Sequence, residues 1–207
     1  MPKFCANLTM LFNEVDFLDR FEKAAKTGFK GVEYLFPYAW KKEQLAEKLG
    51  AFGLSQALHN LPAGDWNKGE RGIACLPGRE TEFQEGVGKA IEYAKALKCP
   101  LVNCLVGLTP AGVPADKVRK TLVANLRFAA AALEKEGIRL LVEALNDKDV
   151  PGFYLVRTAD ALALIKEVGS PNVYFQYDVY HMQIMEGNLT KTIQANLDKI
   201  AHIQIAD

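Results

Sequence analysis

The 207-residue sequence lacks several features that would place it in a common class of binding protein. Lysine plus arginine equals aspartate plus glutamate at 25 each, so the basic surplus that typically binds nucleic-acid phosphates is missing. No apolar run approaches the roughly 18 residues of a membrane span, and no signal peptide follows Met1. We therefore expect a cytoplasmic protein that binds neither nucleic acid nor membrane.

Common catalytic and redox motifs are also missing. The four cysteines (Cys5, Cys75, Cys99 and Cys104) form no CxxC pair, so we expect reduced structural thiols, as is usual in the cytosol. The sequence has no P-loop, no serine nucleophile elbow and no GxGxxG after the first predicted strand. Phosphate-loop, serine-nucleophile and dinucleotide chemistry are therefore not favoured.

What the sequence does have is a regular alternation of two kinds of segment. Apolar runs typical of buried strands alternate with stretches of helical periodicity. The predicted strands are 4–8, 30–35, 54–58, 101–106, 139–145, 173–178 and 200–205; the predicted helices are 16–27, 41–52, 82–97, 116–136, 159–168 and 190–199. Strict alternation predicts parallel strands joined by crossover helices, an α/β fold.

Two α/β architectures fit this alternation, a doubly wound open sheet and a (β/α)8 TIM barrel. The missing GxGxxG removes support from the dinucleotide-binding open sheet, and the barrel is preferred. A barrel needs eight strands and about 250 residues, whereas seven strands and six helices are visible and the sequence stops at Asp207. We expect residues 1–207 to form a single barrel domain that lacks its last βα unit, roughly 50 C-terminal residues.

Oxygen-bearing side chains occur near the ends of three consecutive predicted strands. Glu143 lies inside an otherwise apolar strand, Asp178 ends the next, and Gln204 lies near the end of the last. A bare buried carboxylate costs several kcal/mol unless a metal, a cation or a proton compensates. Because parallel strand ends converge at one mouth of a barrel, these three side chains are candidate ligands of a divalent metal, Mg²⁺ or Mn²⁺ by preference.

The sequence leaves a structural explanation open for the same residues. Glu143 could pair with a buried arginine or lysine, and Asp178 could cap the turn that follows it. His202 lies two residues before Gln204 and shares its strand face at a deeper level. We expect His202 to be a core residue or a support for the site.

Four further residues are candidate substrate contacts. His181 follows the sixth predicted strand and should lie in the loop above it, and His59 ends the third strand. Glu33 ends the second strand and should line the mouth or pair with a lid arginine. Arg71 belongs to the long glycine-rich connection 59–81, a predicted lid, from which its guanidinium could clamp a substrate carboxylate.

The order of these segments resembles the hydroxypyruvate isomerase family, one of the xylose-isomerase-like barrels. The resemblance covers essentially the whole chain and includes the runs 69–74 (GERGIA) and 176–183 (QYDVYHMQ). Its most specific parts are the lid stretch and 178–183. The other matching runs are 7–12, 31–38, 60–66, 141–146 and 202–207.

The resemblance implies an isomerase that interconverts hydroxypyruvate and 2-hydroxy-3-oxopropanoate (tartronate semialdehyde) through a metal-stabilised enediolate, in glyoxylate metabolism. Family members use two glutamates to donate and accept the proton; Glu143 matches the first, and the second belongs to strand eight. By similarity to metal-binding epimerases, Glu143, Asp178 and Gln204 would be three of four metal ligands, although those epimerases have histidine in place of Gln204. Arg71 or His181 would hold the substrate carboxylate.

Three other functions stay open at this point. A ketose 3-epimerase would use the same chemistry on a longer sugar. Metal-dependent phosphodiester cleavage, as in endonuclease IV, is disfavoured by the balanced charge. The chain could also be an inactive truncated fragment. For the isomerase and for the epimerase the partner is a small molecule, and a homo-oligomer is compatible with the sequence.

Overall fold

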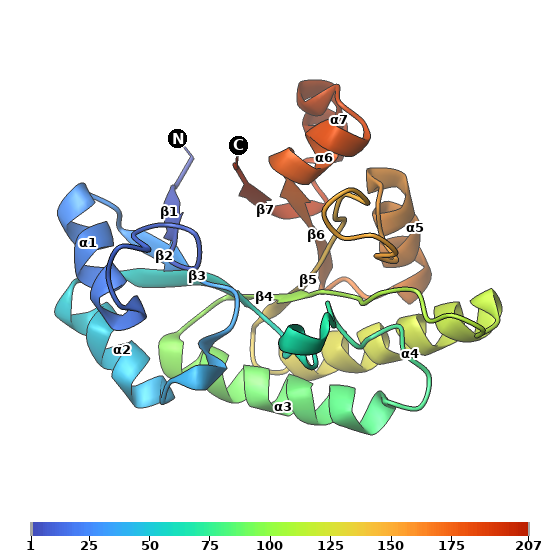
Figure 1. Ribbon diagram of the computed structural model, residues 1–207, viewed down its shortest axis with the longest axis horizontal. Helices are drawn as coiled ribbons and strands as arrows, with labels where there is room; N and C mark the ends of the chain where they lie inside the picture. The colour runs from blue at the N-terminus through green and yellow to red at the C-terminus, as the bar shows by residue number, and fades with distance from the viewer. Residues whose placement is uncertain (1, 207) are drawn as a thin grey trace.

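Seven parallel strands form one sheet in sequence order in the computed structural model, which describes residues 2–206 (Figure 1). The strands are β1 (Cys5–Asn7), β2 (Gly31–Glu33), β3 (Ser55–Asn60), β4 (Leu101–Cys104), β5 (Arg139–Glu143), β6 (Val173–Asp178) and β7 (Ile200–Gln204). Each overlaps a predicted strand, so the predicted strand order is confirmed. Most of the differences are shorter ends, although β3 runs on to Asn60.

Helices connect successive strands and cover the outside of the sheet (Figure 1). The α-helices are α1 (Arg20–Thr27), α2 (Lys42–Ala51), α3 (Glu80–Leu97), α4 (Ala115–Glu134), α5 (Thr158–Val168), α6 (Val179–Met185) and α7 (Leu189–Asn196). Short 3-10 turns are η1 (Phe17–Asp19), η2 (Pro37–Ala39) and η3 (Trp66–Lys68). Helix α6 was not predicted, because Asp178 ends β6 and begins this helix directly, with no intervening loop.

The sheet is curled rather than flat. In a flat sheet β2 and β7 would lie five strand spacings apart, roughly 24 Å. Instead, His202 Nε2 on β7 lies 2.5 Å from Glu33 Oε2 on β2. This contact across the interior confirms the barrel-type architecture over the doubly wound open sheet. In the described part of the chain, β1 and β7 are the two edges of the sheet.

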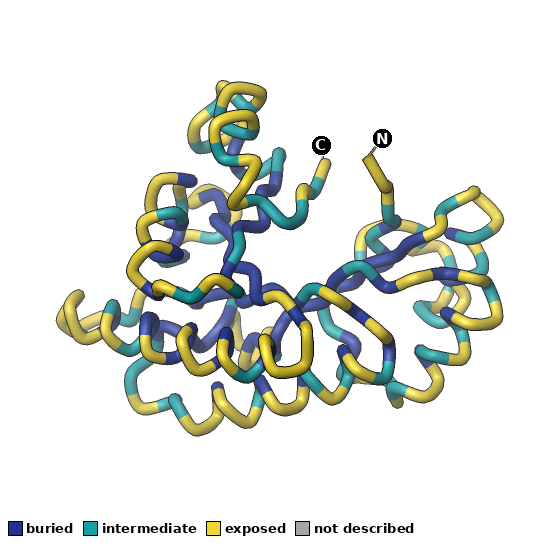
Figure 2. Tube along the Cα trace, turned by 180° about the vertical axis from the view of Figure 1, so that it is seen from behind, coloured by how far each residue is buried: buried dark blue, intermediate teal, exposed yellow. Residues whose placement is uncertain are grey.

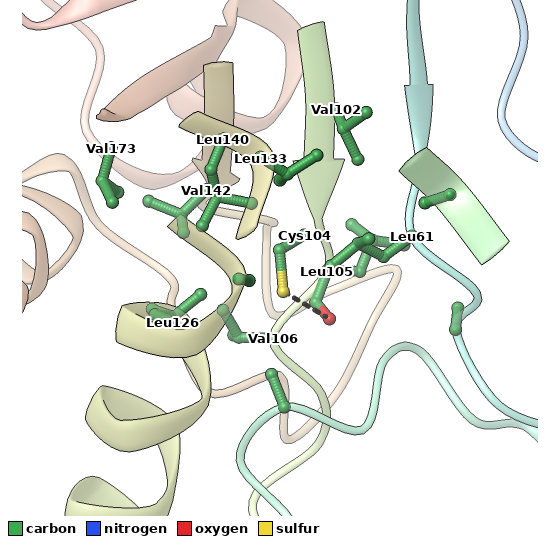
Figure 3. Close-up of a cluster of buried hydrophobic side chains, with 14 of the residues drawn as sticks. Leu61, Val102, Cys104, Leu105, Val106, Leu126, Leu133, Leu140, Val142 and Val173 are labelled. Atoms are coloured by element: carbon green, nitrogen blue, oxygen red, sulfur yellow. Dashed lines mark hydrogen bonds between the residues drawn. The ribbon is translucent and has the colours of Figure 1, made fainter. Parts of the chain in front are cut away.

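Strand alternation sends Glu143 to the inside of the curl. Leu140 and Val142 on β5 pack with Leu126 and Leu133 of α4 in the outer hydrophobic core (Figure 3). Successive side chains on a strand point to opposite faces, so Glu143 points inward. Most residues of strands β2 to β6 are buried, and the outer helix surfaces are exposed (Figure 2).

The same alternation places His59 away from the interior. Asn60 faces inward, where its Oδ1 accepts a hydrogen bond of 3.2 Å from Asn103 Nδ2, so His59 points to the helix layer. The His59 ring is fully buried, lies edge-on to Tyr38 with centroids 6.1 Å apart, and has Nδ1 3.4 Å from Gln56 Nε2. Asn60, not His59, is therefore the residue at the end of β3 that faces the inside of the curled sheet.

The connection between β3 and α3 is anchored in its second half. Ile73, Ala74 and Cys75 are buried, whereas the Trp66 side chain at η3 is exposed. Gly72 has φ +112° and lies so close to the segment that follows β4 that a Cβ atom would collide with the backbone oxygen of Leu105. The predicted lid thus has a fixed base and an exposed tip.

None of the helices described for residues 2–206 combines the length and the apolar character required to cross a bilayer.

We predict that Gly72→Ala destabilises the protein more than Gly69→Ala. Both glycines have positive φ, +112° and +88°, so each alanine should cost about 1 kcal/mol of backbone strain. Only residue 72 would add a collision with backbone, worth roughly 2 kcal/mol more. Urea unfolding measures the difference, and equal losses of stability in the two variants would contradict the close approach.

We predict that His59 makes stability depend on pH below neutrality. Burial lowers the pKa of His59 from 6.5 to about 4, so the unfolded chain binds more protons than the folded chain between these values. The contribution is fully present above pH 6.5, and about 3 kcal/mol of it is lost as the pH falls to 4. Chemical unfolding of wild type and His59→Phe from pH 4 to 7 tests this, since the variant should lack that slope. Parallel pH profiles would contradict it.

Candidate active site

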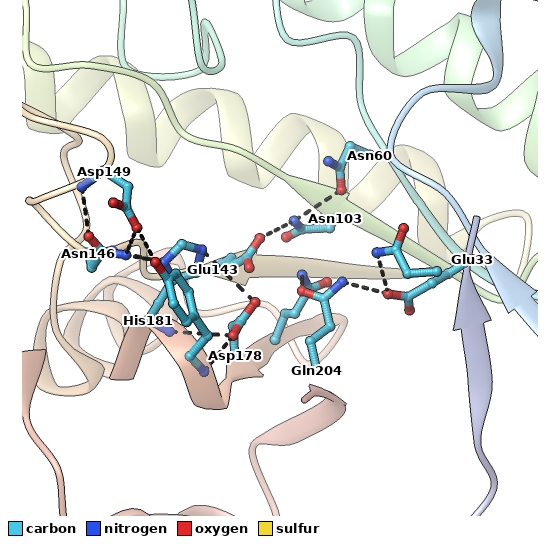
Figure 4. A network of polar contacts seen from close by, with 12 residues as sticks. Glu33, Asn60, Asn103, Glu143, Asn146, Asp149, Asp178, His181 and Gln204 are labelled. Atoms are coloured by element: carbon cyan, nitrogen blue, oxygen red, sulfur yellow. Dashed lines mark hydrogen bonds and ion pairs between the residues drawn. The ribbon is translucent and has the colours of Figure 1, made fainter. Parts of the chain in front are cut away.

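Polar side chains from six strands meet on the inner face of the sheet near the carboxyl ends of the strands (Figure 4). These residues are Glu33, Asn60, Asn103, Glu143, Gln176, Asp178 and Gln204, and we call them the strand-end cluster. The cluster forms because parallel strands present their carboxyl ends on one side of a barrel.

Glu143 is deeply buried within the cluster, with 5% of its surface exposed. Its Oε2 accepts a hydrogen bond of 2.9 Å from Asn103 Nδ2. Burial and the charge of Asp178 raise the pKa of Glu143 to about 8, against the opposing effect of hydrogen bonds from Gln176 and Asn103. No lysine or arginine among residues 2–206 forms an ion pair with Glu143, so the expected alternative of a basic partner is not seen.

The two carboxylate oxygens of Asp178 have different partners. Oδ1 caps helix α6 by accepting hydrogen bonds from the backbone N–H groups of Tyr180 (2.8 Å) and His181 (3.4 Å). Oδ2 lies 4.0 Å from His181 Nε2. Burial raises the pKa of Asp178 although His181 and the two capping hydrogen bonds oppose the shift. The capping hydrogen bonds therefore use only Oδ1, and Oδ2 remains available to bind a ligand in the site.

His181 lies in α6, so the expectation of a loop position was wrong. Its Nδ1 faces two donors of Asn146, the backbone N–H at 3.2 Å and side-chain Nδ2 at 2.8 Å. The amide orientation is fixed, since Asn146 Oδ1 accepts from the backbone of Lys148 and Asp149. Burial lowers the pKa of His181. The ring is therefore neutral with its proton on Nε2, which makes Nε2 a hydrogen-bond donor toward the site.

Gln204 lies beside Asp178 in the strand register and bridges two other members of the cluster. Its Nε2 donates to Glu33 Oε1 at 2.7 Å, and its Oε1 accepts from Gln176 Nε2 at 2.8 Å. Gln176 lies in register with Glu143, and its own buried Oε1 has no partner in the described chain. An oxygen without a donor thus lies next to the two carboxylates.

Glu33 is held on both oxygens. Asn7 Nδ2 donates to Oε1 at 3.0 Å, in addition to Gln204, and His202 contacts Oε2. Burial alone would raise the pKa of Glu33, but His202, Gln204 and Cys5 together lower it. Its partner across the interior is thus a histidine of β7 rather than the lid arginine considered from the sequence.

Arg71 lies on the exposed part of the β3–α3 connection. Its guanidinium carbon stacks 3.9 Å from the centroid of the Trp66 ring. Nη1 donates to the carbonyl oxygens of Trp66 (3.2 Å) and Glu70 (2.8 Å). Within residues 2–206, Nε and Nη2 have no hydrogen-bond acceptor, so one edge of the guanidinium is free for a ligand. The structure does not join Arg71 to the strand-end cluster.

Sequence reasoning missed the amides that surround Glu143. Asn60, Asn103 and Gln176 are buried polar residues within apolar strands, the same signal that identified Glu143. Asn146, which fixes the tautomer of His181, follows β5 by three residues and had no such signal.

The donor set fits a divalent metal with hard oxygen ligands. One donor atom each from Glu143, Asp178 and His181 lies within 4.8 Å of the others. Two buried carboxylates with raised pKa values and a buried amide oxygen without a donor form a set of oxygens whose charge and lone pairs a divalent cation would compensate. Because His181 carries its proton on Nε2, the oxygens of Glu143, Asp178 and the neighbouring glutamines suit the ion better than this imidazole.

Sequence comparison relates this chain to known proteins. A sequence model of the xylose isomerase-like TIM barrel family matches residues 21–207. The chain is 58% identical over 207 residues to the hydroxypyruvate isomerase of Escherichia coli, covering 100% of this chain and 80% of that protein. It is 46% identical over 206 residues to the 2-oxo-tetronate isomerase of Cupriavidus necator, covering 100% of this chain and 79% of that protein.

Solved structures give the same result for the fold. A protein from Brucella melitensis described as an AP endonuclease of family 2 superposes with a TM-score of 0.97 at 45% identity, covering 100% of this chain and 80% of that one. An L-ribulose 3-epimerase superposes with a TM-score of 0.76 at 22% identity over 92% of this chain and 64% of that one, a likeness of fold alone. The expected family is confirmed, and the chain belongs to the xylose isomerase-like TIM barrels.

Proposed function

We propose that this chain is an isomerase that interconverts hydroxypyruvate and 2-hydroxy-3-oxopropanoate. The 58% identity to a hydroxypyruvate isomerase supports this substrate. The single observation that carries the chemistry is Glu143, a buried carboxyl group whose pKa is about 8 at the end of a barrel strand. A pKa near the working pH is the property that a general base and acid requires.

The reaction moves one proton between neighbouring carbons. Removing a proton from C3 of hydroxypyruvate gives an enediolate, and returning a proton to C2 gives the aldehyde; the O3 proton passes to O2. Asn103 donates to Glu143 Oε2, so Oε1 is the atom that would take the proton from C3. The second glutamate of the family, which belongs to strand eight, would supply a proton to C2. His181 Nε2–H can donate to a substrate oxygen and so offset the negative charge that develops there.

Glu143, Asp178 and Gln204 would hold the metal, with the free oxygen of Gln176 beside them. Mg²⁺ or Mn²⁺ bound there would polarise the substrate oxygens and offset the charge of the enediolate. Its positive charge would also favour ionised Glu143 and so make this residue a base at neutral pH.

The substrate carboxylate needs a cationic or donor partner, and Arg71 is our candidate. Its free Nε and Nη2 form a fork that matches a carboxylate. The Trp66 ring and the two backbone carbonyls already hold the guanidinium in one plane. Glu33 and His181 are further proposed contacts of the substrate.

The free thiols support a reducing setting such as the cytoplasm.

A four-carbon substrate is the second candidate. Three relatives named 2-oxo-tetronate isomerase are 43–46% identical to this chain, and 2-oxo-tetronate would need the same proton transfer from C3 to C2. The two substrates differ by one hydroxymethyl group at the reacting carbon. Measuring kcat/KM for both acids distinguishes these candidates. A higher kcat/KM for 2-oxo-tetronate would make it, rather than hydroxypyruvate, the proposed substrate.

We predict that Glu143→Gln lowers kcat for hydroxypyruvate at least about 10³-fold, because an amide cannot accept the C3 proton. The fold should persist, since the amide keeps the volume of the side chain and an acceptor for Asn103. Circular dichroism checks the fold, and the exposed Glu85→Gln on α3 is the matched control, with unchanged turnover expected. If kcat of Glu143→Gln stays within tenfold of the wild-type value, Glu143 is not the base that accepts the C3 proton.

We predict that chelation lowers activity and that Mg²⁺ or Mn²⁺ restores it. With the cation removed, two carboxylates of raised pKa share the site without compensation. Activity should be measured after EDTA treatment and desalting, with metal content determined by mass spectrometry and with Asp178→Asn as a comparison that should not recover. Full activity in protein verified to be free of metal would leave the carboxylates to act alone.

A further inference from the structure

We propose a second cation site, formed by Cys5, Glu33 and His202, that binds Zn²⁺ or another thiophilic metal. One donor atom from each residue lies within 4.8 Å of the others. The residues come from three strands, β1, β2 and β7, and none is a ligand proposed for the first metal. The proposed isomerisation requires no thiol, so the reaction does not explain the cysteine.

The distances already approach those of a tetrahedral site. Zinc binds thiolate at about 2.3 Å and imidazole or carboxylate at about 2.0 Å, so neighbouring ligand atoms lie roughly 3.3–3.6 Å apart. Cys5 Sγ is 3.5 Å from Glu33 Oε2. His202 Nε2 is 2.5 Å from the same oxygen, so metal binding requires these two atoms to separate by about 1 Å.

The carboxylate of Glu33 is oriented as in a metal site. Asn7 Nδ2 at 3.0 Å and Gln204 Nε2 at 2.7 Å both donate to Oε1. These hydrogen bonds fix the carboxylate plane and turn Oε2 toward Cys5 and His202. Ligating carboxylates are typically held in this way by hydrogen bonds from outside the ligand set.

The donor chemistry separates this site from the strand-end carboxylates. Thiolate, imidazole and one carboxylate select zinc and related metals, whereas the oxygen set around Glu143 suits Mg²⁺ or Mn²⁺. Binding would release the thiol proton of Cys5 and the proton that His202 Nε2 shares with Glu33 Oε2, which frees Nε2 to bind the metal. Three protein ligands leave a fourth position for water. Cys5 and His202 are half-buried, which gives a cation a route to the site.

The test is spectroscopic titration of the full 207-residue chain with Co²⁺ or Cd²⁺ in place of Zn²⁺, in excess Mg²⁺ to occupy the first site. A thiolate-to-metal charge-transfer band should grow to one equivalent, and Zn²⁺ should abolish it. Cys5→Ser should lose the band, and His202→Gln should lose it or need at least 100-fold more metal. Asn7→Ala should weaken binding about 10- to 100-fold.

Matched controls keep the result specific. Asp178→Asn disrupts the first site and Cys99→Ala removes a buried thiol that lies outside the cluster, so both should retain the band. Circular dichroism confirms that each variant is folded. No band in wild type, a band that survives Cys5→Ser, or unchanged affinity in His202→Gln would each overturn the site. None of these readouts depends on turnover, so they stand apart from the test of the isomerase.

Discussion

Two carboxylates, Glu143 and Asp178, lie buried side by side without a lysine or arginine paired to either in the described chain. Burial and mutual repulsion raise the pKa of Glu143 to about 8. A soluble domain avoids that cost unless function requires it. The surrounding amides of Asn103 and Gln176 reduce the cost without removing it, because they supply hydrogen bonds and no net charge. A cation and a proton are the remaining means of compensation, and the proposed reaction uses both.

Much of the fold could be predicted from the sequence. Parallel strands are apolar on both faces and the helices are amphipathic, so the two alternate visibly along the chain. Helix α6 was not predicted because it is short and begins directly after Asp178, which caps it. Local sequence patterns do not distinguish such a capped turn from a loop. The strand ends were overestimated at β2 and β4, where apolar residues continue past the last ladder pair.

Site residues could be predicted where a polar side chain stands out within or at the end of an apolar strand. They could not be predicted where their position depends on tertiary contacts. Glu143 and Asp178 were identifiable because a carboxylate interrupts or ends an apolar run. His59 illustrates the limit of that reasoning: a shift of one residue along a strand moves a side chain to the other face, and Asn60 faces the cluster instead. The stacking of Arg71 on Trp66 and the contact of His202 with Glu33 depend on loop path and sheet curl, which no short pattern encodes.

The central claim is that Glu143 removes a proton from the carbon next to the substrate carbonyl. Proton NMR of hydroxypyruvate in D₂O tests it most directly, by following deuterium at C3 of the substrate and C2 of the product, with enzyme-free hydroxypyruvate as the background. We predict enzyme-dependent deuterium incorporation that is absent in Glu143→Gln. Isomerisation in which the product keeps the original hydrogen and none exchanges, as in a direct hydride shift, or exchange that persists in Glu143→Gln, would contradict the account.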